Sequence, residues 1–373
     1  MEHQKDLSTV ERLDWLRLIR SENVGPITFF QLIDRFGNAK DALAAIPELA
    51  RKGGRKKPIR ICAKSTAEQE MEEILNFGGH MIAACESTYP TGLKQIADPP
   101  PIISVKGQSQ LLKKDIIGIV GSRNASAVSM SLTQQFSTGL GRGGLVVASG
   151  LARGIDTAAH KAALTEGTIA VVGGGINISY PKENHPLQEA IGERGCLIAE
   201  QPFNTQPQAR HFPRRNRIIS GISIAILVME ATPRSGSLIT ARMAAEQGRD
   251  VFAVPGSPMD PRARGSNNLI RNGAILAEDA GEILQELASS RGLRLSEPDQ
   301  PLLPFNTPRV PDETEIEEAR PRILSLLSPT AVNIDEIIRL SELAPATVMT
   351  ILLELELAGR IERHFGNRVS FTS

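Results

Sequence analysis

The sequence has 373 residues, 41% of them hydrophobic and 23% charged, so it is long enough for two or three globular domains with substantial cores. Its 42 Lys and Arg residues equal its 42 Asp and Glu residues, which excludes a protein that coats nucleic acid by bulk electrostatics; a polyanion must be met by a local patch. The cysteines, Cys62, Cys85 and Cys196, show no metal-ligand or disulfide spacing and fit a reducing compartment.

The start of the chain lacks the apolar segment of a signal peptide. The longest apolar run, "ISIAILVM", is far shorter than the roughly 18 residues that span a bilayer. We therefore expect a cytoplasmic protein that has no membrane contact, no metal and no cofactor.

Residues 1–85 are expected to form a small helical, SAM-like domain with a helix-hairpin-helix pattern. Apolar residues recur at helical spacing on both sides of the turn "NVGP", where we expect a positive φ at Gly25 and the first helical turn at Pro26. Such hairpins can present N–H groups to a phosphate, but an αα-corner uses the same residues, and we favour the corner. The basic stretch "RKGGRKKPIR" that follows is either an accessory anion contact or a solvated loop.

Residues 86–290 alternate short apolar runs with helical stretches. This alternation predicts a Rossmann-like fold, an extended parallel sheet with helices on both faces, in which ligands bind at the carboxyl ends of the strands. The predicted strands are "DIIGIVG", "LVVASG", "TIAVVGGG", "CLIAE", "AILVMEA" and "VFAVPGS".

The loops that follow these runs combine glycines, hydroxyl groups and cations, which are the groups that bind phosphate. Any one of these loops alone would be read as a turn or as surface charge; their convergence on one rim favours a binding site. The candidate DNA-binding residues are Gly121, Ser122, Arg123, Gly150, Lys182, Asn184, Arg214, Asn216, Arg217, Ser235, Gly236 and Ser237.

The densest of these loops is "HFPRRNRIISG", where three arginines fall within four residues of one another. Pro213 suits the first turn of a helix, so we expect the arginines and the positive end of that helix to point at the rim. Tyr180, in a neighbouring loop that begins with three glycines, is positioned to stack on a base. We expect His160 to be a packed or surface imidazole and not a catalyst, because no Ser or Cys nucleophile is marked beside it.

Residues 291–316 are rich in proline and are expected to be a linker, and residues 317–373 are expected to be a winged-helix domain. The domain would consist of three helices and a β-hairpin that turns at Gly366-Asn367. Its third helix, "PATVMTILLELELAG", offers no side chain suited to base edges and carries Glu354 and Glu356. We therefore interpret this domain as a protein-contact or auxiliary module.

Taken together, several stretches resemble the DNA-processing protein A (DprA or Smf) family. They are "GIVGSRNAS", "SGLARGIDTAAHKAAL", "GGGINISYPKENHPL", "HFPRRNRIISGIS", "RSGSLITARMAAEQGRDVFAVPGS" and "GSNNLIRNGAIL". The resemblance covers almost the whole middle domain in order, and the flanking helical and winged-helix domains fit it. It implies a protein that binds single-stranded DNA, loads RecA recombinase in natural transformation, works as a homodimer and has no established catalytic activity.

The resemblance also assigns residues. It places Gly121, Ser122, Arg123, Lys182, Asn184, Asn216 and Arg217 in the DNA pocket. It makes "GSNNLIRNGAIL" the dimer and RecA-contacting face, with Leu269, Ile270 and Leu276 at the dimer interface. Asn267 and Asn268 stand where some members carry histidines, which weakens the carry-over for the polar part of that face.

The alternative is a Rossmann-like enzyme that binds a nucleotide or nucleoside phosphate. Related enzymes use a Gly-Gly-x-Gly-Thr-x-x-Glu motif at the helix start where this chain has "RSGSLIT", and Thr240 then occupies the position of the glutamate. The general acid/base is missing, and the sequence contains no GxxxxGK[ST] loop. We therefore expect a protein that is not an enzyme.

Overall fold

The computed structural model describes residues 6–294, 312–364 and 366–372. The chain divides into two units: Met1–Leu7 with Glu68–Glu297, and Ser8–Ala67 with Pro298–Ser373. The N-terminal helices and the winged-helix domain therefore belong to one unit. Most of the expected linker, residues 295–311, lies outside the described residues.

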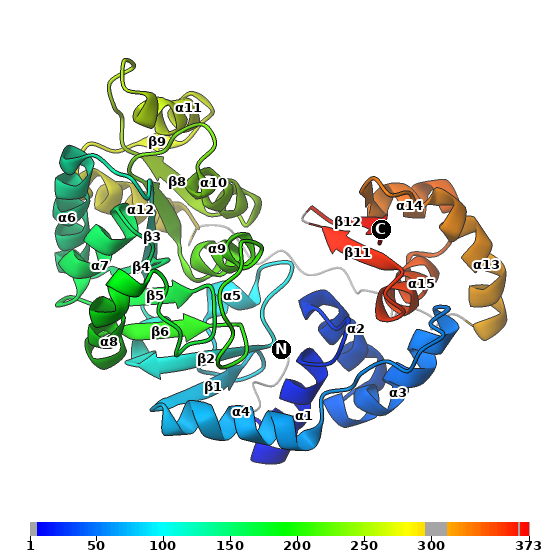
Figure 1. The fold of residues 1–373 in the computed structure, drawn as a ribbon. Helices are drawn as coiled ribbons and strands as arrows, with labels where there is room; N and C mark the ends of the chain where they lie inside the picture. Colours follow the sequence, from blue (N-terminus) through cyan, green and yellow to red (C-terminus); the bar gives the residue numbers. More distant parts are fainter. Residues whose placement is uncertain (1–5, 295–311, 365, 373) are drawn as a thin grey trace. The chain divides into compact units, whose positions relative to one another are not determined.

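The larger unit is built on a sheet to which nine strands contribute within the described residues, in the order β1-β2-β6-β5-β4-β3-β7-β8-β9 (Figure 1). The strands are β1 Gly79–Ala83, β2 Ile102–Gly107, β3 Ile116–Val120, β4 Val146–Ser149, β5 Thr168–Val172, β6 Cys196–Ala199, β7 Ala225–Val228, β8 Asp250–Ala253 and β9 Ile275–Leu276. Neighbours from β6 to β9 run parallel, which confirms the predicted parallel sheet and its six apolar strands.

Two strands at one edge of the sheet were not anticipated. β2 pairs antiparallel with β6, and β1 pairs antiparallel with β2. β1 lies within the segment expected to be a helical domain, so the sheet begins at Gly79, ahead of the expected boundary at residue 85.

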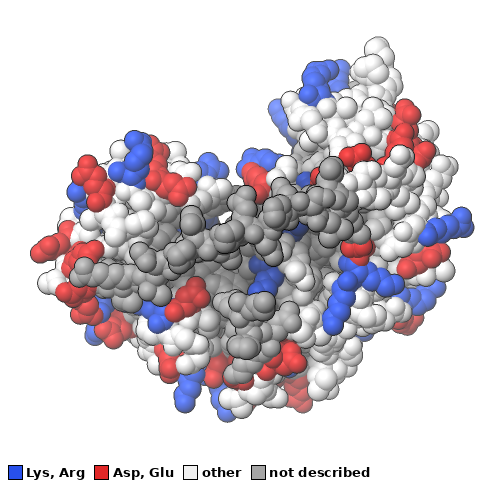
Figure 2. Space-filling model, turned by 180° about the vertical axis from the view of Figure 1, so that it is seen from behind, with Lys and Arg blue, Asp and Glu red and all other residues white. Residues whose placement is uncertain are grey.

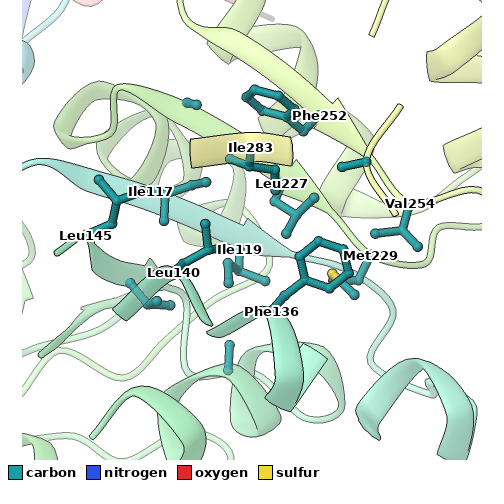
Figure 3. Packing of buried hydrophobic residues seen from close by; sticks show 14 of the residues in the cluster. Ile117, Ile119, Phe136, Leu140, Leu145, Leu227, Met229, Phe252, Val254 and Ile283 are labelled. Carbon is teal, nitrogen blue, oxygen red and sulfur yellow. The ribbon is translucent and has the colours of Figure 1, made fainter. Parts of the chain in front are cut away.

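The helices of this unit cover both faces of the sheet. They are α4 Lys64–Asn76, α5 Thr91–Lys94, α6 Ala127–Arg142, α7 Ile155–Ala163, α8 His185–Arg194, α9 His211–Ile222, α10 Gly236–Glu246, α11 Arg264–Arg271 and α12 Ala280–Arg294. On one face, Phe136 and Leu140 of α6 and Ile283 of α12 pack on strand residues such as Ile119 and Leu227 (Figure 3). The central strands are apolar throughout because they are buried on both faces.

The smaller unit contains three N-terminal helices and a winged-helix domain, as predicted. Its helices are α1 Thr9–Ile19, α2 Pro26–Phe36, α3 Ala39–Lys52, α13 Glu313–Leu326, α14 Ile334–Ser341 and α15 Pro345–Leu357. The wing consists of β10 Val332–Asn333, β11 Ile361–His364 and β12 Arg368–Phe371, and the hairpin turns at Gly366 and Asn367, both with positive φ. The expected positive φ at Gly25 is wrong: its φ is −92°, and Asn23 takes the left-handed conformation instead.

Within this unit, the third helix of the winged helix packs against α2 and α3 (Figure 1). Gly53 lies so close to α15 that a Cβ there would overlap the carbonyl oxygen of Glu354. Asn23 donates a hydrogen bond of 3.2 Å from Nδ2 to the carbonyl oxygen of Leu357. The Glu354 carboxylate is buried and paired with Arg320. The helix that a DNA-reading winged helix inserts into a groove is therefore engaged inside its own unit.

None of the described helices is long and apolar enough to cross a membrane. On the face shown in Figure 2, Lys and Arg side chains are interspersed with Asp and Glu side chains, in keeping with the balanced charge of the sequence.

Candidate functional site

The predicted site loops lie at one edge of the sheet. β3 to β7 are parallel, so the loops that follow them all leave the sheet at its carboxyl edge, which we call the rim. The order of strands reverses at β3, which pairs with β4 on one side and β7 on the other. Such a reversal opens a crevice between the loops on its two sides, and ligands of open α/β sheets bind there.

The three arginines of α9 have different surroundings. Arg214 is exposed, whereas Arg215 is only 6% exposed and donates hydrogen bonds from Nη1 to the carbonyl oxygens of Gly150 and Val171. Burial lowers the pKa of Arg215 to about 10; Asp156 opposes the change and Arg123 adds to it. A Cβ on Gly150 would overlap the Arg215 guanidinium, so Gly150 is required for packing. Arg215 therefore joins the ends of β4 and β5.

Arg217, a predicted DNA contact, is 3% exposed and lies in an ion-pair network. Its Nε lies 3.2 Å from Asp98 Oδ2, and its Nη2 pairs with Glu200. Burial alone would lower the pKa of Arg217, but the two carboxylates raise it above the usual value. The carboxylates of Asp98 and Glu200 already neutralise the Arg217 guanidinium, so we leave Arg217 out of the proposed interface.

Two further predicted contacts are buried in hydrogen-bonded positions. Asn184 donates from Nδ2 to the carbonyl oxygen of Leu151 and to Thr157 Oγ1, both at 2.9 Å, and so fixes the loop after β4. Ser237 is buried with its Oγ 2.6 Å from Ser235 Oγ, and Ser235 caps the start of α10. These residues shape the rim from within.

Gly121 and Ser122 hold the loop after β3 in place. A Cβ on Gly121 would lie 2.5 Å from the side chain of Ile155, and the Ser122 carbonyl accepts a hydrogen bond of 3.2 Å from the Ile155 N–H. Ser122 Oγ accepts another from Asn124 N–H at 3.2 Å. The loop is thereby fixed against the first turn of α7, and Arg123 projects from it into solvent.

The exposed part of the rim is cationic and aromatic. The Arg123 guanidinium lies 5.3 Å from the centre of the Phe212 ring, and the Tyr180 and Phe212 rings are 5.4 Å apart at 39°. Tyr180 is 51% exposed, and Lys182 and Arg214 are also exposed. We call these five residues the rim surface.

The sequence reasoning missed Phe212. Its signal was an aromatic residue two positions before a pair of arginines, at the start of a helix that faces the strand ends. Arg234 and Gly236, in the loop after β7, are also exposed, and Asn216 is half-buried, with Nδ2 3.4 Å from the Gly236 carbonyl oxygen.

The three glycines after β5 could allow a ligand to approach the backbone closely, but the structure fills the space beside them with other parts of the chain. A Cβ on Gly174 would lie 2.7 Å from the carbonyl oxygen of Thr205, and one on Gly175 would lie 2.7 Å from that of Pro202. The close approach that these glycines permit is therefore made by the protein's own backbone.

His160 and Thr240, the two residues considered in connection with catalysis, are both buried. His160 is fully buried, with Nδ1 2.7 Å from Thr168 Oγ1, and burial lowers its pKa to about 3, as expected of a packed imidazole. Thr240 is buried on α10 and supplies no acid. Among the described residues, no group of three or more His, Cys, Asp or Glu side chains is arranged to hold a metal ion.

The predicted dimer segment spans α11 and β9. Leu269 and Ile270 are half-buried, and Leu276 is 44% exposed on β9, the last strand at its edge of the sheet.

The fold and the rim define an α/β protein with a cationic, aromatic rim surface, which is preceded in the chain by a helix-hairpin-helix domain and followed by a winged-helix domain. Residues 80–288 match the family model of DNA recombination-mediator protein A. Residues 9–72 match a DprA-like N-terminal HHH domain, and residues 307–367 match a DprA winged helix domain. The chain therefore belongs to the DNA recombination-mediator protein A (DprA) family.

Individual relatives agree. Protein Smf of Escherichia coli is 40% identical over 285 residues, which cover 76% of this chain and 75% of the relative. The X-ray structure of DprA from Streptococcus pneumoniae superposes with a TM-score of 0.62 at 34% identity, covering 76% of this chain and 99% of that one. DprA from Helicobacter pylori, whose structure is described with its single-stranded DNA binding mode, gives a TM-score of 0.53 at 25% identity over 57% of this chain and 96% of that one.

Proposed function

We propose that this chain binds single-stranded DNA on the rim surface and acts as a recombination mediator that loads RecA recombinase onto the bound strand in natural transformation. We further propose that it works as a homodimer and catalyses no reaction. Family membership and the single-stranded DNA binding described for the H. pylori relative support this proposal.

The observation that carries the proposal is the rim surface itself. Arg215 and Arg217 are bound to groups within the protein, whereas Arg123, Lys182 and Arg214 remain exposed, and Arg123 lies near the Phe212 ring. Cationic side chains bind the phosphates along a nucleic-acid backbone. An exposed aromatic ring can stack on any base, and this stacking contributes roughly 1–3 kcal/mol of binding free energy per base.

The same surface favours single strands over duplexes. Stacking on Tyr180 requires a base whose face is free, and a duplex hides those faces between neighbouring base pairs. The engaged α15 does not offer a duplex the helix that winged-helix proteins insert into a groove.

The test is a titration of the purified protein with single- and double-stranded oligonucleotides over a salt series. Arg123→Ala and Lys182→Ala should each lower the slope of log affinity against log salt by roughly 0.7, the value for one phosphate contact with a single strand. Tyr180→Leu should weaken binding without changing that slope. Arg142→Ala is the matched control, because Arg142 is exposed in the last turn of α6 and so lies away from the rim.

Unchanged affinity and slope in the Arg123 and Lys182 variants would remove the rim surface as the binding site. Turnover in a parallel nucleotide-hydrolysis assay would favour the enzyme alternative. RecA loading is tested separately, by following RecA assembly on single-stranded DNA with and without the protein, and an unchanged assembly rate would contradict the mediator role.

A further inference from the structure

A cavity of about 400 Å³ lies outside the rim surface, between the loop after β7 and helix α11. Pro233, Leu238 and Pro258 contribute apolar walls, and Arg264, Asn268 and Arg271 contribute polar side chains. Pro233, Leu238, Pro258 and Arg264 belong to no set assigned above, whereas Asn268 and Arg271 lie in the stretch "GSNNLIRNGAIL", which the resemblance assigns to the dimer and RecA-contacting face but not to DNA binding.

The cavity carries two cations that the protein does not neutralise. Arg264 and Arg271 are exposed, and among the described residues neither makes an ion pair. They are seven residues apart on α11, about two helical turns or roughly 10 Å along the axis, so both lie on the same side of the helix. No Asp or Glu lines the cavity, so its charge is positive.

The walls of the cavity are held in place by backbone contacts. Gly265 N–H donates a hydrogen bond of 2.7 Å to the carbonyl oxygen of Ala231, and a Cβ on Gly265 would lie 2.5 Å from the same atom. Asn267 accepts from Gly256 N–H at 3.0 Å and donates to the Gly256 carbonyl oxygen at 2.8 Å. These contacts fix α11 to the ends of β7 and β8 before any ligand arrives.

The cavity and the rim share the loop that follows β7. Pro233 lines the cavity, and Arg234, Ser235 and Gly236 follow directly along the same loop. The Gly236 carbonyl oxygen lies 3.4 Å from Asn216 Nδ2 on α9, the helix that carries Arg214, so the loop after β7 contacts both the cavity and α9.

We propose that this cavity is a second nucleotide subsite for the same DNA strand. The apolar walls would receive the flat face of a base, Arg264 and Arg271 would bind phosphates, and the Asn268 amide, which has no hydrogen-bond partner among the described residues, would bind a base edge. This inference rests on the proposed single-stranded DNA binding. A nucleotide fits better than an acidic peptide because the cavity is lined by the loop after β7, which is one of the loops of the rim.

The experiment compares a short oligonucleotide, which reaches only the rim surface, with a series of longer ones. In the double variant Arg264→Ala/Arg271→Ala, short-strand affinity should stay at the wild-type value. For long strands the slope of log affinity against log salt should be smaller in magnitude by roughly 1.4 than in wild type. The ratio of wild-type to variant affinity should therefore decrease roughly sevenfold between 50 and 200 mM salt. Arg264→Lys/Arg271→Lys keeps both charges and should retain the slope.

The matched control is Arg142→Ala/Arg194→Ala, which removes two exposed arginines from the last turns of α6 and α8. Thermal unfolding and sedimentation of each variant check that the fold and assembly are unchanged. A wild-type slope in the double variant, with Arg123→Ala still impaired, overturns the subsite and leaves the proposed function standing. Loss of binding to an acidic peptide with DNA affinity intact also overturns it, in favour of a protein ligand. Wild-type behaviour of both Arg123→Ala and the double variant refutes the proposed function itself.

Discussion

The neighbouring arginines of α9 give a sharp test of how the structure divides one sequence motif into two roles. Arg214 is exposed on the rim surface, and Arg215 is buried with hydrogen bonds to two strand-end carbonyls. Arg214→Ala should therefore weaken DNA binding and leave stability within about 0.5 kcal/mol, as surface substitutions usually do. Arg215→Ala should destabilise the fold.

The cost of Arg215→Ala follows from what it leaves behind. Two carbonyl oxygens lose a charged donor, at about 1.5–3 kcal/mol each. Asp156, which is buried, also loses a neighbouring positive charge that favours its ionised form. These terms overlap, so we expect a total of about 4 kcal/mol. Arg215→Lys, which keeps the charge but lacks the fork, should fall between wild type and Arg215→Ala.

The assay must report on the larger unit, and the single tryptophan, Trp15, lies in the smaller one. Hydrogen exchange of the β4 and β5 amides, read by mass spectrometry, gives the local opening free energy where Arg215 acts. Equal protection in Arg214→Ala and Arg215→Ala would refute the reasoning. So would a larger loss in Arg214→Ala.

Two further perturbations test the packing. Gly53→Ala should lower the hydrogen-exchange protection of α3 and α15 by about 1–3 kcal/mol, because its Cβ would overlap α15. The control is Gly25→Ala, which should cost no more than about 1 kcal/mol because the space around Gly25 is open. Equal costs for the two variants would contradict the contact between α3 and α15. Burial lowers the pKa of His160 from 6.5 to about 3. Below pH 6.5 the unfolded chain therefore binds a proton at this residue while the folded chain does not, so the free energy of unfolding decreases as the pH is lowered. Denaturant unfolding should show wild type losing about 2–3 kcal/mol more than His160→Gln between pH 6.5 and 4.5, and parallel profiles would show that His160 is not held neutral.

The sheet was predictable because its strands are buried on both faces. A strand such as β5 then appears as an unbroken apolar run, and the loop that follows it can be located without knowing the fold. β1 escaped prediction because it lies on the edge strand of the sheet and its second residue, His80, is exposed, which breaks the run.

The roles of individual arginines were not predictable because their partners are distant in sequence. Arg217 donates to the carbonyl oxygen of Asp98, which is 119 residues away. From sequence spacing, Arg214 and Arg217 lie in the same cluster and both were predicted to contact DNA. Only the fold determines which of them is buried. The contact of Gly53 with Glu354 is likewise invisible to local pattern.

The dimer interface remains a prediction, and the edge of the sheet supplies its physical basis. β9 is the last strand on its side, and Leu276 on it is 44% exposed, with Ile270 half-buried on the preceding helix. An exposed apolar side chain on an edge strand favours association with a second copy of the chain. A symmetric dimer would bury Ile270 and Leu276 against their counterparts and would place two rim surfaces on one assembly. Placing Glu at both positions, in Ile270→Glu/Leu276→Glu, would bury unpaired charge and should cost several kcal/mol of association free energy. Sedimentation at micromolar concentration should show a wild-type dimer, a monomeric double variant and a dimeric Val10→Glu control, which alters an exposed apolar residue on α1. A monomeric wild type, or a double variant that associates as tightly as wild type, would place the interface elsewhere.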